Sequence, residues 1–287
     1  MTKENLLFLL LSVSLTSGRN IASKKTAADN SATSHFFFSQ AMLFLAAALL
    51  LTGFNITSFS AISVTTIIYG IIYGILLIAS QWMFTLALKI GSTSICSVVY
   101  SLGFIIPTIS GSIFWNEEFT ITDLLGFTLA LTTIAVTVIG KEKSGKSGKT
   151  FVLPIIVAMI SSGGLGIMQK VQQNSAYKSE RNEFLIIAFT LAFLSSIIGF
   201  MCCKNKAKIQ KRNVIFPSVA GLCFGGANLF NTILAGRIKS AAFFPLQNIS
   251  VILLSTLLGI ILFKEKISLK NIAIIILGAI TVIIFSI

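Results

Sequence analysis

The sequence predicts an all-helical membrane protein, in which ten transmembrane helices form two inverted five-helix repeats. Composition is the first observation behind this prediction: 55% of the 287 residues are hydrophobic and only 11% are charged, whereas soluble domains carry about 25% charged residues. The second is that the apolar residues form long uncharged runs, and the third is that motifs of the first half recur in the second. Too few polar side chains remain to cover a water-exposed surface.

We expect a membrane helix at each apolar run, because about 20 residues of helix cross the hydrocarbon core of a bilayer. The runs are apolar on every side, so they lack the alternation of polar and apolar residues that membrane β-barrels show. In chain order the expected spans cover residues 5–23, 36–54, 63–88, 93–114, 121–140, 151–171, 184–203, 214–236, 240–263 and 269–287. The connections are short, so a separate soluble domain has no room.

Three sequence matches divide the ten spans into two units of five. In chain order they pair Ser17-Gly18 with Ser162-Gly163, Ala87–Ser92 with Ala235–Ser240, and Trp115–Glu117 with Phe263–Glu265, at offsets of 145 to 148 residues. An odd number of spans in each unit places the second unit upside down in the membrane, the inverted-repeat architecture of many transporters. We therefore expect repeats at residues 1–144 and 145–287, with a solute site near the membrane midplane between them.

The first span has a second interpretation, since Lys3 followed by the apolar run from Leu6 to Leu15 resembles a secretion signal. Its partner in the repeat is the sixth span, and a repeat without its first helix would be incomplete. We therefore expect the first span to remain in the folded protein.

The residues around the fourth span resemble a known family signature. The stretch Pro107–Glu117 followed by Asp123–Gly126, with Ala87–Ser94 before it, is similar to the drug/metabolite transporter superfamily, EamA type. Phe263–Ser268 followed by Leu277–Ala279 looks like the second copy, and the resemblance covers essentially the whole chain. It implies ten helices, a central cavity lined by spans one, three, four, six, eight and nine, and transport of small organic solutes across the cell membrane.

The loop between the repeats matches a phosphate-binding motif, because Gly140, Gly145, Lys146 and Ser147 fit the pattern G-x-x-x-x-G-K-[ST]. A working phosphate loop joins a buried strand to a helix, and it needs a separate Asp to hold magnesium. Here membrane spans flank the loop, and no soluble sheet exists to carry that acid. We interpret the loop as a linker that binds no nucleotide, and we expect no cofactor.

Charge and metal-binding residue types argue against other function classes. The net charge of +13 fits loops that fix the topology and contact anionic lipid better than it fits nucleic-acid binding. The four cysteines lack metal-ligand spacing, and the single histidine, His35, has no acid or cysteine partner at helical spacing. Because no acid lies in the middle of a span, we expect neither an enzyme nor the buried-carboxylate mechanism of the small multidrug exporters.

Arg19 and Asn20 are the leading candidates for substrate binding, because Arg19 lies about two-thirds of the way along the first span, where a charge is costly. Its guanidinium suits a substrate carboxylate or phosphate. The alternative is that Arg19 extends to the membrane surface, since Lys24 and Lys25 follow one to two turns later. Both interpretations stay open at this point.

Further polar and aromatic residues lie in spans that the resemblance assigns to the cavity. Some of them are three or four residues apart and so share a helix face. The predicted site residues are Tyr69, Tyr73, Gln81 and Trp82 in span three, Tyr100 in span four, Asn228 and Asn231 in span eight, and Gln247 and Asn248 in span nine. The alternative roles are hydrogen bonding between helices and, for Tyr69 and Trp82, an aromatic girdle at the membrane surface.

These residues predict a secondary transporter that moves a small polar or anionic, amino-acid-like metabolite across the cell membrane by alternating access. Coupling to a proton or another ion is left open, and no ATP motor is implied. The alternative is a flippase of lipids or lipid carriers from the same superfamily, in which Arg19 and the basic loops hold phosphates. A membrane enzyme ranks third.

Membrane orientation gives a first test of the topology. With Arg19 left aside, the connections after odd-numbered spans hold 15 Lys and Arg residues, whereas the termini and the other connections hold 6. The charge rule therefore places both termini outside. The resemblance implies cytoplasmic termini. We follow the resemblance because equivalent loops of inverted halves lie on opposite sides of the membrane, which weakens the charge rule. A reporter that works only in the cytoplasm should be active when fused after Ile287, and activity of an exterior-only reporter there would contradict this orientation.

Overall fold

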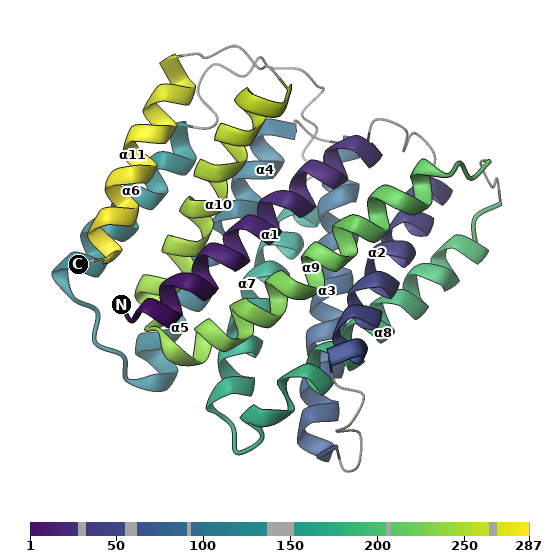
Figure 1. The fold of residues 1–287 in the computed structure, drawn as a ribbon, viewed down its shortest axis with the longest axis horizontal. Coiled ribbons are helices and arrows are strands. Elements are labelled where there is room, and N and C mark those ends of the chain that lie inside the picture. The colour runs from purple at the N-terminus through teal and green to yellow at the C-terminus, as the bar shows by residue number, and fades with distance from the viewer. Residues whose placement is uncertain are drawn as a thin grey trace. The chain divides into compact units, whose positions relative to one another are not determined.

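The computed structural model describes residues 1–27, 33–54, 62–90, 93–136, 152–204, 208–263 and 269–286. These residues form helices and their connections, with no β-strand among them (Figure 1). The helices are α1 (Lys3–Ala27), α2 (Thr33–Phe54), α3 (Val64–Ile90), α4 (Thr93–Ser101), α5 (Ile105–Trp115), α6 (Ile121–Val136), α7 (Val152–Asn174), α8 (Arg181–Met201), α9 (Arg212–Arg237), α10 (Ser240–Phe263) and α11 (Leu269–Ser286), with 3₁₀ turns η1 (Leu102–Phe104) and η3 (Lys178–Glu180). The predicted all-helical class is confirmed.

Helices occupy all ten predicted spans in the described residues. Eight of the helical segments are long and apolar enough to cross a membrane, and two shorter apolar ones lie at Ile121–Val136 and Ile272–Phe285. Large aliphatic side chains such as Leu49 and Ile261 remain exposed on them, as expected of surfaces that face lipid. The chain is therefore a multi-pass membrane protein. The last four residues of the predicted fifth span lie outside the described part.

The fourth span is interrupted, which the apolar pattern did not predict. It consists of α4, the 3₁₀ turn η1 and α5. Pro107 has no N–H to donate to the carbonyl of Gly103 four residues earlier, and such a loss bends or breaks a helix. The turn at Gly103 also packs closely on α7, because an added Cβ there would lie 2.8 Å from the carbonyl oxygen of Met159.

The Trp115–Glu117 motif ends α5 and contacts the first residue of α10. Asn116 takes a left-handed conformation with φ of 51°, and the N–H of Glu117 donates to the carbonyl oxygen of Gly111 at 3.2 Å. The Glu117 carboxylate then accepts the backbone N–H of Ser240 at 2.7 Å. A carboxylate at this place stabilises the positive end of the helix. The motif therefore has a structural role, which joins α5 to α10.

A second acid holds the start of α3 in the same manner. Ser63 precedes α3, and its Oγ accepts the backbone N–H of Thr66 at 3.1 Å. The carboxylate of Glu180 in η3 accepts the N–H of Ser63 at 3.1 Å and its hydroxyl at 2.8 Å. Both acids thus use the free N–H groups that every helix N-terminus exposes.

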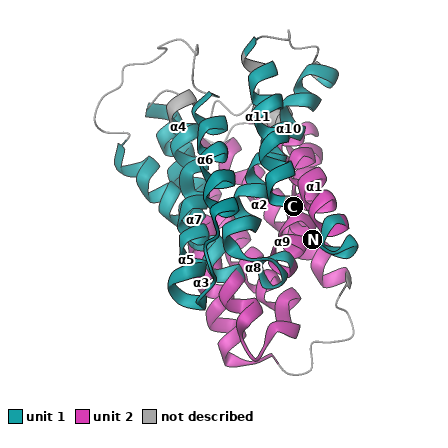
Figure 2. Cartoon of the chain, turned by 90° about the vertical axis from the view of Figure 1, so that its left-hand side faces the viewer, with its two compact units in different colours: residues 1–6, 79–169, 234–287 teal, residues 7–78, 170–233 magenta. Residues whose placement is uncertain are grey.

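The chain divides into two compact units (Figure 2). Unit 1 comprises residues 1–6, 79–169 and 234–287, and unit 2 comprises residues 7–78 and 170–233. Four helices, α1, α3, α7 and α9, contribute residues to both units. These units are a different division of the chain from the repeats predicted at 1–144 and 145–287. The junction of the repeats, with the Gly140–Ser147 loop, lies outside the described residues, so the repeat boundaries stay a prediction.

Each unit pairs helices from both halves of the chain. In unit 1, α6 packs on α11, and α5 packs on α10. In unit 2, α2 packs on α8, with Phe38 and Phe200 in ring contact at 5.5 Å between centroids. Each of these pairs joins helices that hold the same rank in the two predicted repeats.

Glycines allow close helix approach within unit 2. An added Cβ at Gly74 of α3 would lie 3.1 Å from the carbonyl oxygen of Ala188 in α8. One at Gly225 of α9 would lie 3.1 Å from the Cα of Ala47 in α2. Small residues at such contacts let helix backbones pack in lipid, where no hydrophobic force drives helices together.

Gly221→Ala should destabilise unit 2, because the added Cβ would overlap the backbone carbonyl oxygen of Leu43, which cannot rotate away. Overpacking of this kind costs about 1–3 kcal/mol, so the thermal unfolding midpoint of the purified protein in detergent should fall. Gly53→Ala is the matched control, since no atom lies within 4 Å of its added Cβ. Equal midpoints for the two variants would contradict the close approach of α9 and α2.

Candidate functional site

Polar side chains line the contact between α1 and α9 in unit 2. The hydroxyl of Ser12 donates to the side-chain oxygen of Asn231, and the guanidinium of Arg19 lies over the ring of Phe224, 4.2 Å from its centroid. Residue numbers rise along α1 as they fall along α9, so the two helices run antiparallel. Residues seven apart lie on one face of a helix. Ser12 and Arg19 therefore form one stripe on α1, and Phe224 and Asn231 form the stripe of α9 that faces it.

Tyr73 of α3 reaches the same stripe of α9. Its hydroxyl donates to the side-chain oxygen of Asn228 at 2.7 Å, while the Asn228 amide donates to the carbonyl oxygen of Phe224 at 2.9 Å. Tyr73 is 1% exposed, and its ring meets Phe184 edge-on at 4.9 Å between centroids. The structure therefore brings Tyr73 and Asn228 together as a buried hydrogen-bonded pair between α3 and α9.

Arg19 is the charged member of this group. Its side chain is half-buried, and the Phe224 ring beneath it also contacts Phe44 and Phe189, at 6.3 and 5.6 Å between centroids. A guanidinium on a ring face gains a cation–π attraction, which is stronger away from water. Because the fork of N–H donors lies in the guanidinium plane, stacking on a ring is compatible with holding an anion at its edge.

The other unit 2 candidates lie beside these residues in sequence. Asn20 is exposed on α1, and Tyr69 is half-buried one turn before Tyr73 on α3. The cavity role of Arg19 and its extension to the membrane surface both stay predictions. The side chains of Lys24 and Lys25, on which the second interpretation depends, lie outside the described part.

Five predicted site residues belong to unit 1. The Tyr100 hydroxyl lies 2.9 Å from the hydroxyl of Ser80. The ring of Tyr100 contacts the ring of Phe84, with 4.4 Å between the centroids. Tyr100 therefore links α4 to α3. Gln81 and Trp82 are half-buried on α3, and Gln247 and Asn248 are half-buried on α10.

Sequence reasoning missed several residues of these clusters. Ser12 and Ser80 supply the partners of Asn231 and Tyr100, but isolated serines in apolar runs carry no distinctive signal. Lys170 of α7 and Glu183 of α8, both in unit 2, are also buried, each 5% exposed. Ionisable groups in or beside spans are functional candidates by default. Lys170 is near the end of the predicted sixth span and Glu183 just precedes the seventh, and these positions were the available signal.

Comparison with known proteins identifies the family. The family described as Sugar transport protein matches residues 115–287, which is more than half of the chain. The chain belongs to the sugar transport protein family. As a member of this membrane transporter family, it carries small solutes across a membrane. The match does not test the narrower resemblance to the EamA type, which stays a prediction.

Structural comparison shows that this sugar transport family member shares its fold with a solved protein. One crystal structure superposes with a TM-score of 0.81 over 99% of this chain and 96% of the other, at 14% sequence identity. At that identity the likeness concerns the fold alone. No curated protein matches the chain in sequence.

Tyr73→Phe should lower stability, because it leaves the buried oxygen of Asn228 without its hydroxyl donor. Hydrogen bonds between membrane helices contribute about 0.6–2 kcal/mol, so the thermal midpoint should fall slightly. Tyr69→Phe, one turn away on the same helix, is the control. In a double-mutant cycle with Asn228→Ala the two losses should not add, and simple additivity would show that the pair does not interact.

Proposed function

We propose that this protein is a secondary transporter that moves a small polar solute, a sugar, by alternating access. The match of residues 115–287 to the family described as Sugar transport protein carries this proposal. The chemistry of the candidate residues supports it. Sugar hydroxyls both donate and accept hydrogen bonds, and so do the amides of Asn228, Asn231, Gln247 and Asn248.

The aromatic candidates support the same substrate class. Solute sites are mostly apolar surfaces with a few placed polar groups, and Tyr69, Trp82 and Tyr100 supply flat apolar faces that carry a polar edge. The described residues of the predicted spans hold few charges, which suits an uncharged solute. Binding would require the amides to exchange their present partners, such as Ser12 on Asn231, for solute hydroxyls.

The division of helices between the compact units supports alternating access. The four helices that contribute to both units, α1, α3, α7 and α9, are spans one, three, six and eight. The EamA resemblance assigns all four to the cavity, and they form two equivalent pairs in the predicted repeats. Inverted-repeat transporters work by rocking one set of helices against another around a fixed site, which needs no nucleotide.

A second candidate substrate is a small anionic solute of the amino-acid type. Arg19 is the observation that favours it, because a half-buried guanidinium over an aromatic ring is a common way to hold a carboxylate. Arg19 also distinguishes the two substrate classes, since a full positive charge adds little binding free energy for a neutral sugar.

Counterflow into liposomes tests both candidates without ATP or an ion gradient. Liposomes that contain the purified protein and are preloaded with unlabelled sugar should take up labelled sugar. Matched liposomes preloaded with unlabelled amino acids should not take up labelled amino acids.

The variant Arg19→Gln should change the half-saturation concentration for a sugar less than about threefold. For an anionic substrate, loss of a charged hydrogen bond to the carboxylate would raise that concentration about tenfold or more. Lys178→Gln, exposed on η3, is the charge-matched control. Counterflow of amino acids alone, abolished by Arg19→Gln, would overturn the sugar proposal.

A further inference from the structure

A second polar feature lies in unit 1, at the N-terminal end of α1. There a cavity of about 580 Å³ opens between the first residues of α1, the corner that joins α9 to α10, and the end of α11. Its charged lining comes from Arg237, the last residue of α9, and Lys239, which precedes α10. Thr2 and Asn5 add a hydroxyl and an amide.

The corner that carries the two cations is held in place by backbone contacts. The N–H of Ile238 donates to the carbonyl oxygen of Leu234 at 2.9 Å, which ends α9. The Glu117 carboxylate accepts the N–H of Ser240 at 2.7 Å and so fixes the start of α10. Opposite the corner, the N–H of Asn5 donates to Thr2 Oγ1 at 3.3 Å in the first turn of α1.

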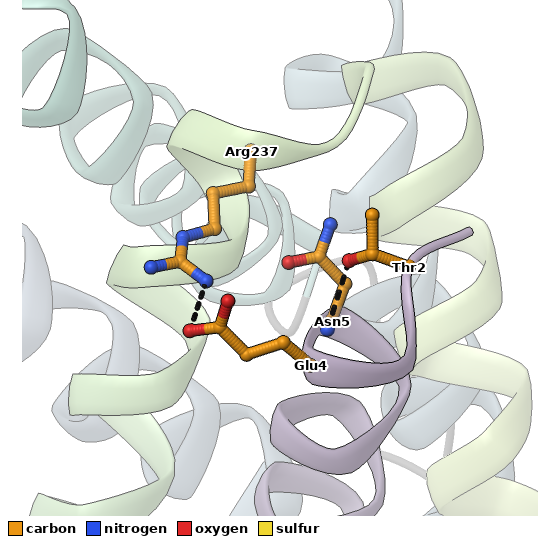
Figure 3. Close-up of polar contacts among 4 residues, drawn as sticks. All are labelled: Thr2, Glu4, Asn5 and Arg237. Carbon is orange, nitrogen blue, oxygen red and sulfur yellow. Dashed lines mark hydrogen bonds and ion pairs between the residues drawn. The ribbon is translucent and has the colours of Figure 1, made fainter.

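The Glu4 carboxylate pairs with the Arg237 guanidinium (Figure 3). Glu4 Oε1 lies 2.7 Å from the Arg237 guanidinium, and the two side chains are 60% and 41% exposed. An exposed ion pair of this kind contributes little to stability. The pair therefore keeps the guanidinium extended beside the cavity at low cost, and another anion can take the place of Glu4.

The floor of the cavity is apolar. Leu246 of α10 and Phe285 of α11 line it together with Ala242. All four contributing helices have a terminus here, and helices that cross a membrane end at headgroup depth. A cationic rim over an apolar floor at this depth fits an amphiphilic anion, with its charged group on the rim and its hydrocarbon on the floor.

We propose that this cavity binds a phosphate-bearing anion at the membrane surface, with Arg237 and Lys239 on the phosphate and Glu4 as the carboxylate that the anion displaces. Arg237 suits the phosphate because its planar fork donates two parallel hydrogen bonds, and Lys239 adds a point charge. The anion is either the headgroup of an anionic phospholipid or a free phosphate, and both present the same oxygens. The proposal is independent of the transported solute.

Two substitutions that break the same ion pair separate this proposal from a structural role. Arg237→Gln removes the anion's partner and should weaken binding, as should Lys239→Gln, about fivefold for each charge lost near the membrane. Glu4→Gln removes the competitor and should strengthen binding severalfold. If the pair only stabilised the fold, both Glu4→Gln and Arg237→Gln would act in the same direction.

Binding is measured on the full-length protein purified in detergent, with folding of each variant checked by its thermal midpoint. One arm uses labelled short-chain phosphatidylglycerol against phosphatidylcholine, and the other uses labelled inorganic phosphate. Lys211→Gln is the matched control, because Lys211 is exposed next to the opposite end of α9. Preference for phosphatidylglycerol identifies a lipid site, and binding of phosphate alone identifies a free-phosphate site.

Three results would overturn the proposal. The first is that neither probe binds. The second is that Glu4→Gln weakens binding as much as Arg237→Gln, which would make the ion pair structural. The third is that Lys211→Gln weakens binding as much as Lys239→Gln, which would show diffuse attraction to the net positive charge.

Discussion

The absence of water in the hydrocarbon core of a bilayer is the constraint on which this structure depends. Backbone groups there must find partners within the chain, which helices provide along their own length. Polar side chains follow the same rule. Thr232 donates back to the carbonyl oxygen of Asn228 one turn earlier at 2.8 Å, and Tyr73 donates across to Asn228. Polar residues in the spans therefore already form hydrogen bonds with the protein in the absence of a solute. A transported solute must offer hydrogen bonds of equal strength to replace them.

The same constraint explains where the charges lie. Glu117 and Glu180 stabilise the N-termini of α10 and α3, where helix N–H groups lack partners. Glu4 and Arg237 meet at the end of α1 and α9, where water is available to both. A buried charge is costly, so Arg19 is exceptional within its span. The two proposals therefore give these cations different roles: Arg19 would distinguish anionic from neutral solutes, and Arg237 would exchange anions at the membrane surface.

The fold also requires glycines where its helices pack closely. Gly70 and Gly74 of α3 lie against α8, and Gly221 and Gly225 of α9 lie against α2. These two contacts are equivalent under the predicted repeat, since α3 and α9 are the third helices of their halves and α2 and α8 the second. Lipid gives apolar side chains no preference for a helix partner, so contact geometry of small residues decides which helices pair. The glycine contacts thus occur at equivalent positions of the two halves that the sequence predicts.

The sequence by itself determined the membrane class, the ten spans and the family resemblance, because the length of an apolar run and the order of motifs are properties of the chain alone. It also selected Tyr73, Asn228, Asn231 and Arg19 as polar residues in apolar surroundings. It did not determine their partners: Asn228 lies 155 residues from Tyr73, and Ser12 lies 219 residues from Asn231. Only the tertiary structure decided these pairings, the interruption at Gly103 and the cavity beside Arg237. The physical reason is that spans apolar on every side carry almost no periodic signal to show which face of a helix meets which neighbour.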